Sequence, residues 1–223
     1  RDYAVTGVQT CALPILLSWA HPRDKVGYAW TEPEFWQEVA RTLERGRFDA
    51  LFLADQWAAF DAYQGSIDAT LRYALQFPIH DPLLLVPAMS VATQRLGFAV
   101  TATTTYYAPY MLARKLSTLD HLTKGRIGWN VVTSVHDNEA HNFGLKNMLG
   151  HKERYARAVE FMEVCYKLWD SWESDAVVMD KSRGIFADPA KVHRINHKGE
   201  YFDGVETSTK RTSAMCRSIR VNN

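Results

Sequence analysis

Apolar residues first recur at helical spacing in the segment that follows Thr31. Phe35, Val39 and Leu43 lie three or four positions apart, so they share one face of a helix. The preceding Thr31-Glu32-Pro33-Glu34 has the form of a capping box with proline in the first turn. We therefore predict an amphipathic helix that begins here and ends at Gly46.

The next segments predict a strand and a second helix. Phe48–Leu53 is a short, mostly apolar run of strand length, which places Asp55 just beyond its carboxyl end. A long polar and aromatic loop is expected to follow. Asp81-Pro82 then has the form of a helix cap and first turn, before the apolar run LLLVPAMSVA. Pro87 should bend or shorten this second helix.

The pattern then repeats twice more. Leu96–Val100 predicts a strand that ends in the polar run Thr101–Thr105. Pro109–Gly125 predicts a helix, and Ile127–Val132 predicts a third strand directly after it. Beyond a polar loop, Lys152–Trp172 predicts a fourth helix. The apolar stripes expected on these last two helices are Leu112, Leu116 and Leu119, and Tyr155, Val159, Met162, Tyr166 and Trp169.

This alternation predicts an α/β fold with a parallel sheet. Neither GxGxxG nor GxxxxGK[ST] occurs, so a dinucleotide-binding sheet and a phosphate-loop enzyme are both disfavoured, and a (β/α)8 barrel is the better interpretation. In a barrel, the carboxyl ends of parallel strands meet at one rim. The rim would collect these polar side chains: Asp55, Thr101, Thr103, Thr104, Asn130, Thr133 and Ser134.

Composition excludes several classes of protein. The chain has 223 residues, 26 Lys and Arg against 25 Asp and Glu, and no basic block, so nucleic acid is not an expected partner. No apolar run reaches the roughly 20 residues that cross a bilayer, so we expect no membrane association and a cytoplasmic location. Three cysteines without ligand spacing favour neither disulfides nor a zinc site.

Both ends of the chain differ from its middle. Val5–Ile15 reads VTGVQTCALPI, which is also the translation of a string that resembles a sequencing-library adapter. We therefore interpret residues 1–15 as an artefact, residues 16–203 as a partial barrel domain, and residues 204–223 as a frame-shifted or truncated tail.

Long ordered motifs between these ends resemble one enzyme family. They are WAHP, FWQEVARTLERGRFDALFLAD, RYALQFPIHDP, TATTTYYAPYMLARKLSTLDHLTKGRIGWNVVTS, NFG, HKERYARAVEFMEVCYKLWDSWE and DPAKVHRINHKGEYF. Together they resemble the flavin-dependent monooxygenases related to nitrilotriacetate monooxygenase component A, pristinamycin synthase and dibenzothiophene-sulfone monooxygenase, within the bacterial luciferase-like superfamily.

The resemblance implies a TIM-type barrel, present here as roughly its first half. It implies reduced FMN from a separate NAD(P)H-dependent flavin reductase, oxygen as co-substrate, and a small organic substrate such as an aminopolycarboxylate or a sulfone. At full length we expect a homodimer or homotetramer. The family's serine-containing, glycine-rich phosphate loop is not found in Gly204–Asn223, so we predict that this chain alone neither binds FMN tightly nor turns over.

Within this family, six residues are the expected cofactor contacts. Asp55, Thr101 and Thr103 are expected to lie near the flavin ring, and Asn130, in an apolar strand, needs a polar partner from the barrel or from the ligand. His151 and Tyr155 share one face at a helix start, where free N–H groups favour a phosphate.

Other candidates carry less weight. Arg154 is an equal prospect for the phosphate and for solvent, and His80 and His136 are weaker candidates for acid–base groups, so the catalytic residues are unknown. His193 and His197 lie four apart, but no third ligand supports a metal. An aromatic group is expected in the pocket wall or the core: Trp57, Phe60, Tyr63, Tyr73, Phe77, Tyr106 and Tyr107.

Two other functions stay open. The first is a luciferase-like oxidoreductase that uses the deazaflavin F420. The second is a non-catalytic product, either an inert half-barrel with exposed sheet edges or a flavin-binding scaffold.

Overall fold

The computed structural model describes residues 18–22, 24 and 27–205. The interpretation of residues 1–15 lies outside this range, and so does that of residues 204–223 except for Gly204 and Val205. Among the described residues, none of the helices combines the length and the hydrophobicity that a bilayer span requires.

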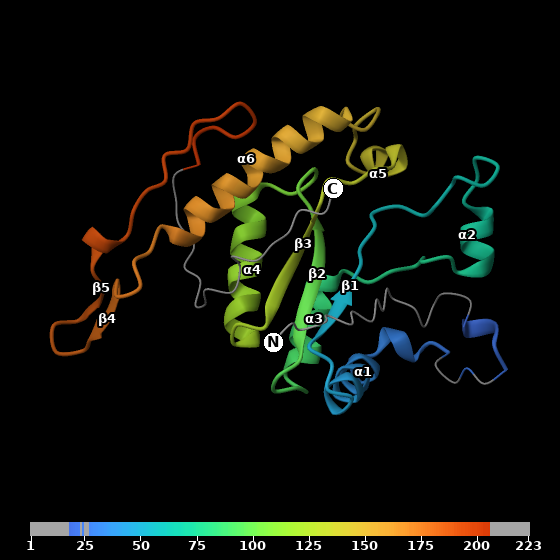
Figure 1. Cartoon of the computed structure of the whole chain (residues 1–223), viewed down its shortest axis with the longest axis horizontal. Helices are drawn as coiled ribbons and strands as arrows, with labels where there is room; N and C mark the ends of the chain where they lie inside the picture. Colours follow the sequence, from blue (N-terminus) through green and yellow to red (C-terminus); the bar gives the residue numbers. More distant parts are fainter. Residues whose placement is uncertain (1–17, 23, 25–26, 206–223) are drawn as a thin grey trace, which may run out of the picture.

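Three parallel strands form the central sheet (Figure 1). They are β1 (Ala50–Leu53), β2 (Gly97–Thr103) and β3 (Ile127–Val132), and they pair in the order β1-β2-β3. The register places Leu53 opposite Val100, and Val100 opposite Trp129. All three predicted strands are therefore confirmed, although β2 extends three residues further and takes Thr101 and Thr103 into the strand.

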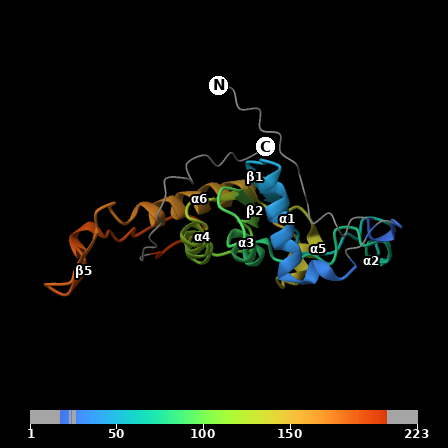
Figure 2. The same ribbon diagram turned by 90° about the horizontal axis from the view of Figure 1, so that it is seen from below.

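Four helices form a row along this sheet. They are α1 (Pro33–Arg45), α3 (Pro82–Ser90), α4 (Pro109–Thr123) and α6 (His151–Asp170). Each packs on the next, and Figure 2 shows α1, α3 and α4 beside one another. A doubly wound sheet reverses its strand order at a switch point, whereas these strands follow the order of the sequence, as in a barrel.

The core lies between the sheet and the helices because successive strand residues point to opposite faces. Phe98 and Val100 of β2 and Trp129 of β3 are almost fully buried there, and Leu112 and Phe161 reach them from α4 and α6. Thr101, Thr103 and Asn130 alternate with these apolar residues and lie on the other face of the sheet. One face therefore supplies packing, and the other carries polar groups.

Several predicted helix details are wrong. Thr31 does not cap α1, since it belongs to the short 3-10 helix η3 (Ala29–Thr31) and its hydroxyl donates to the carbonyl of Tyr28. Of the predicted α6 stripe, Met162 and Trp169 are buried, but Val159 is 70% exposed, and the buried face also includes Ala158, Phe161, Val164, Cys165 and Leu168. The predicted stripe of α6 follows its long aromatic side chains, whereas the packing of α6 against α4 determines which face of the helix is buried.

Two segments expected to be loops contain short helices, α2 (Asp68–Tyr73) and α5 (Asp137–Asn142). Asp81 caps α3 as predicted, because its side chain accepts a hydrogen bond from the amide of Leu83. The remaining elements are an antiparallel hairpin and two 3-10 turns: β4 (Val177–Asp180), β5 (Ile185–Ala187), η2 (Ser18–Ala20) and η4 (Pro189–Lys191).

Candidate functional site

A cavity of about 340 Å³ opens at the carboxyl ends of the three strands. Figure 1 shows that α5 and the beginning of α6 lie at this end of the sheet. The cavity combines apolar walls with hydroxyl and carboxyl groups. Its lining residues are Asp55, Gln56, Trp57, Phe60, Thr101, Thr103, Val131, Val132, Thr133, Ser134, Val135, His136, Glu139, Tyr155 and Ala158.

Thr103 is the centre of a hydroxyl network at the end of β2. Its Oγ1 accepts hydrogen bonds from the amide of Thr105 at 3.2 Å and from the hydroxyl of Ser134 at 3.1 Å. Ser134 has φ 57°, a left-handed conformation that turns the chain directly after β3. In this arrangement, the hydroxyl hydrogen of Thr103 is left to donate to a ligand in the cavity.

Asp55 lies in the cavity wall just after β1. Burial raises the pKa of its carboxyl group to about 7, and the nearby Asp81 carboxylate adds to the rise. A hydrogen bond from Trp57 partly opposes it. Asp55 therefore exchanges a proton near neutral pH, which suits a group that donates to or accepts from a ligand.

Glu139 is a cavity residue that the sequence analysis does not identify. Its side chain is almost fully buried and accepts hydrogen bonds from the amides of Trp57 at 3.2 Å and Val135 at 3.4 Å. Nearby on α5, Asn138 donates to the carbonyl of Ala59 and Asn142 to that of Trp57. The sequence pattern predicts a polar loop here. In the structure, the helical form of α5 places these three side chains where they hydrogen-bond to the segment after β1 that borders the cavity.

Thr101 and Asn130 face each other across β2 and β3. The amide of Asn130 donates to the hydroxyl of Thr101 at 3.0 Å, so one of the two partners considered for Asn130 lies within the barrel. Thr101 lines the cavity, whereas Asn130 is not among the lining residues. Contact between Asn130 and a ligand stays a prediction.

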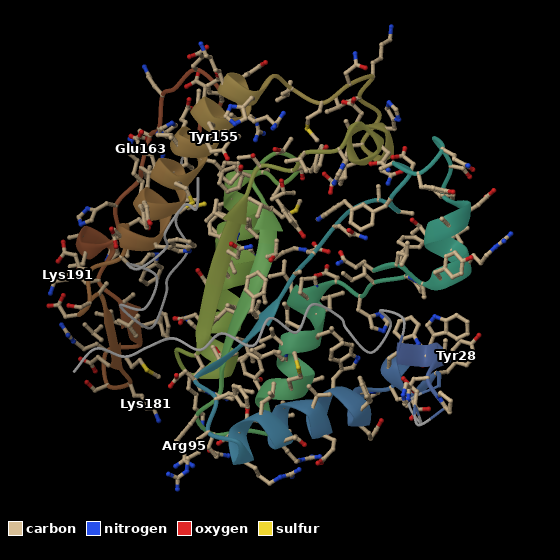
Figure 3. All side chains as sticks on the ribbon, turned by 45° about the vertical axis from the view of Figure 1, so that its right-hand side comes forward. Tyr28, Arg95, Tyr155, Glu163, Lys181 and Lys191 are labelled. Carbon is tan, nitrogen blue, oxygen red and sulfur yellow. The ribbon has the colours of Figure 1, made fainter. Side chains whose placement is uncertain are left out.

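His151 and Tyr155 pack against each other at the beginning of α6, with ring centroids 4.6 Å apart. Tyr155 lines the cavity, and Figure 3 shows it on α6 near the carboxyl ends of the strands. His151 is exposed and lies outside the lining. The N-cap residue of the helix is Gly150, which has no side chain that could accept a hydrogen bond from the first backbone amides of α6.

Arg154 is turned back toward the chain that precedes α6. One terminal nitrogen of its guanidinium donates to the carbonyl of Leu149 at 2.5 Å. Its Nε is buried and has no hydrogen-bond partner among the described residues. Arg154 is not among the residues that line the cavity, so its contact with a phosphate stays a prediction.

The loop histidines differ in position. His80 interacts with the carbonyl of Trp30 at 3.2 Å and packs against the rings of Trp30 and Trp36, outside the cavity. His136 lines the cavity and packs edge-on against Phe60. Of the two weaker acid–base candidates, only His136 therefore lines the cavity.

His193 and His197 do not share a site. His193 pairs with Glu173 at 2.8 Å, and the buried His197 interacts with Glu160 and Lys167. Within the described ranges, no cluster of three or more His, Cys, Asp or Glu side chains is arranged to hold a metal ion.

The aromatic residues divide between the cavity and other surfaces. Trp57 packs against Tyr106, Tyr107 and Phe143, and Tyr106 stacks on Phe143 with centroids 4.0 Å apart. Burial raises the pKa of both tyrosines to about 12. Two other members of the expected group are exposed: Tyr63 and Tyr73.

These residues fit a flat, partly polar ligand. The volume lies within the range of small-molecule sites, and apolar side chains surround a few convergent polar groups. The hydroxyl of Thr103 and the carboxyl of Asp55 can bond to heteroatoms of a flavin ring, and the open amides of α6 suit a phosphate.

Comparison with known proteins identifies related enzymes. Residues 15–215 match the family model described as luciferase-like monooxygenase. A long-chain alkane monooxygenase of Geobacillus thermodenitrificans (strain NG80-2) is 53% identical over 83% of this chain and 42% of that protein. A dimethyl-sulfide monooxygenase of Hyphomicrobium sulfonivorans is 50% identical over 83% of this chain and 38% of that protein. The chain thus spans about two fifths of the length of these relatives.

Solved structures agree with the fold. The crystal structure of a long-chain alkane monooxygenase superposes with a TM-score of 0.84 at 50% identity, covering 88% of this chain and 45% of that one. A riboflavin lyase, solved with modified FMN and riboflavin, gives a TM-score of 0.81 at 38% identity over 90% and 44% of the two chains. The predicted partial barrel is confirmed by these neighbours.

Proposed function

Because this chain belongs to the luciferase-like monooxygenase family, we propose that it provides part of a reduced-FMN site in an enzyme that oxidises a small organic substrate with O2. The observation that carries this proposal is the cavity at the carboxyl ends of β1, β2 and β3, where Asp55 and Thr103 meet apolar walls. Active sites of barrels lie at this end of the strands.

Asp55, Thr101 and Thr103 hold the ring in this proposal. Thr103 donates its hydroxyl hydrogen to a ring heteroatom, since its Oγ1 already accepts from Thr105 and Ser134. Protonated Asp55 donates similarly, and its ionised form accepts. Reduced FMN, when bound, supplies the chemistry that activates O2.

His151 and Tyr155 hold the phosphate in this proposal, together with the open amides after Gly150. The unpartnered Nε of Arg154 can add a charged donor at the same helix end. Trp57, Phe60 and Val131 of the cavity wall exclude water from the ring.

The partners follow from the family. We propose that a separate NAD(P)H-dependent flavin reductase delivers the reduced FMN, and that the full-length enzyme forms a homodimer or homotetramer. The substrate is a small organic molecule, for which an aminopolycarboxylate or a sulfone is one example. Sedimentation of the full-length protein would test the assembly, because a monomer at micromolar concentration would contradict it.

Titration of the chain with oxidised FMN tests the site. We expect saturable binding that is weaker than micromolar, because the described residues supply only some of the contacts that the family implies. Binding should be about tenfold weaker in Thr103→Val, which removes the proposed donor. Thr118→Val is the matched control, since Thr118 is an exposed threonine on α4 outside the cavity lining.

The same titration separates the alternatives. Stronger binding of F420 than of FMN would support the deazaflavin oxidoreductase instead. Saturable FMN binding that is equal in Thr103→Val and the parent would place the flavin elsewhere. Absence of any saturable binding up to millimolar FMN would favour the inert product.

A further inference from the structure

The segment His197–Phe202 is folded against α6 by one carboxylate. Glu160 accepts hydrogen bonds from the amides of Glu200, Tyr201 and Phe202 at 3.1, 3.0 and 2.8 Å. The Nε2 atom of His197 lies 3.2 Å from the same carboxylate. The proposed function assigns no role to this segment.

Gly199 is required for this close approach. A Cβ atom at position 199 would lie 1.9 Å from Oε1 of Glu160 and 2.7 Å from Nε2 of His197. A side chain at this position would therefore push the segment away from Glu160. Glycine at position 199 therefore allows this close approach, and a larger residue would require Glu160, His197 or the segment itself to shift.

Arg157 connects this segment to the sheet. Its guanidinium stacks over the ring of Phe202, 4.6 Å from the centroid, and one of its nitrogens donates to the carbonyl of Thr104. Thr104 is buried directly after the end of β2, and its amide donates to the carbonyl of Val132. Without Arg157, the Thr104 carbonyl would lose a charged donor in a buried position.

We infer that Arg157 is a positioning residue, through which the folded segment His197–Phe202 holds the carboxyl end of β2 in the geometry that the cavity needs. Thr104 lies between Thr103, which lines the cavity, and Thr105, whose amide bonds to the Thr103 hydroxyl. Thr105 also donates its own hydroxyl to the carbonyl of Thr133 at 2.6 Å. A shift at the Thr104 carbonyl therefore moves the Thr103 hydroxyl.

Hydrogen exchange of the ligand-free chain tests this coupling. The readout is the ratio of amide exchange at Thr104 and Thr105 to exchange at Leu116, a buried residue in the middle of α4. Arg157→Met should raise this ratio about tenfold, the effect of losing one hydrogen bond from a charged donor. Gly199→Ala should raise it in the same direction, although the added Cβ would first meet Glu160 and His197 rather than Arg157 or β2.

Two further variants separate positioning from general stability. Arg126→Met removes the half-buried arginine at the opposite end of β3, so it should destabilise the chain without raising the ratio. Arg157→Lys keeps a charge and one donor, and should stay within about threefold of the parent. If Arg157→Met fails to fold, Gly199→Ala and Arg157→Lys decide the question.

An unchanged ratio in both Arg157→Met and Gly199→Ala would overturn the inference. A ratio that rises equally in Arg126→Met would also overturn it, because the effect would then be global. The ligand readout rests on the proposed function: FMN affinity should fall about tenfold in Arg157→Met and remain within twofold in Arg126→Met. If the parent binds no FMN, the proposed function fails while the exchange ratio still decides the role of Arg157.

Discussion

The two ends of the three-stranded sheet use polar groups in opposite ways. At the amino end, the Arg126 guanidinium donates to the carbonyls of Ser90, Thr93, Leu96 and Thr123 and to the hydroxyl of Thr93. At the carboxyl end, polar groups open onto a cavity of about 340 Å³. The contacts of Arg126 that maintain the fold and the cavity of the proposed flavin site therefore lie at different ends of the same strands.

Both ends rely on an arginine that donates to backbone carbonyls. Burial lowers the pKa of Arg126 and of Arg157, which is the signature of a partly desolvated cation. The difference lies in what surrounds the carbonyls. Those around Arg126 belong to the last residues of α3 and α4 and to the segment before β2, whereas the Thr104 carbonyl bound by Arg157 lies next to Thr103, which lines the cavity.

The largest expected effect is at the amino end. Arg126→Met should lower the free energy of unfolding by about 4 kcal/mol, because several carbonyls lose a charged donor at once. Urea denaturation followed by circular dichroism measures this change. Arg95→Met is the control, since Arg95 is an exposed cation at the same end and should change the free energy by less than about 0.5 kcal/mol. Equal losses of unfolding free energy in Arg126→Met and Arg95→Met would contradict a stabilising role for the hydrogen bonds of Arg126.

A pH-dependent effect is expected only at the carboxyl end. The pKa of Asp55 is raised to about 7, so the folded chain holds a proton that the unfolded chain releases above its ordinary pKa. This contribution is fully present at low pH, and it should be lost as pH rises to about 7, by up to about 4 kcal/mol.

Asp55→Asn should remove this dependence. The variant gains stability relative to the parent as pH rises from about 4 to about 8. Chemical denaturation at several pH values measures the difference. Asp49→Asn, an exposed aspartate before β1, is the control and should follow the parent. A constant difference between Asp55→Asn and the parent across this range would show that Asp55 does not titrate there.

A smaller effect concerns ligand affinity. Thr103→Ser keeps the hydroxyl that we propose as a donor, so its FMN affinity should remain within about twofold of the parent, in contrast to the tenfold loss in Thr103→Val. Isothermal titration of the three proteins measures this. Equal weakening in the serine and valine variants would assign the effect to packing of the Thr103 methyl group rather than to hydrogen bonding.

The smallest effect distinguishes the two partners considered for Asn130. Thr101→Val removes the acceptor of the Asn130 amide and should cost about 1 kcal/mol of stability. Thermal melts with and without FMN measure it. If FMN raises the melting temperature of Thr101→Val more than that of the parent, the Asn130 amide bonds to the ligand. If the two increases are equal, Thr101 is the structural partner of Asn130. Thr118→Val, on the exposed face of α4, is the control.

The sequence predicted the order of strands and long helices because each carries its own periodicity. In Ile127–Val132, every second residue is buried. Pro109 begins α4, and Gly125 follows two residues after its end. Short elements failed for the opposite reason. α2 and α5 are each six residues long, too short to show an apolar period above the surrounding polar loop.

Part of the site could also be predicted. Asp55, Thr101 and Thr103 follow from their positions at strand ends, and Tyr155 from its motif, and all four line the cavity. Glu139 could not be found in this way, because a glutamate in a polar segment looks like a solvated residue until its burial is known. The nearby Asp137 gives no signal that distinguishes it.

The sequence by itself determined which segments become strands and helices, and that polar residues follow three successive strands. Those features depend on local spacing, which a linear chain records directly. The tertiary structure decided which polar groups meet each other and which meet a ligand. Asn130 bonding to Thr101, Glu139 turning inward and Arg157 reaching Thr104 all join residues 29 to 82 positions apart or depend on burial, and only packing brings such groups together.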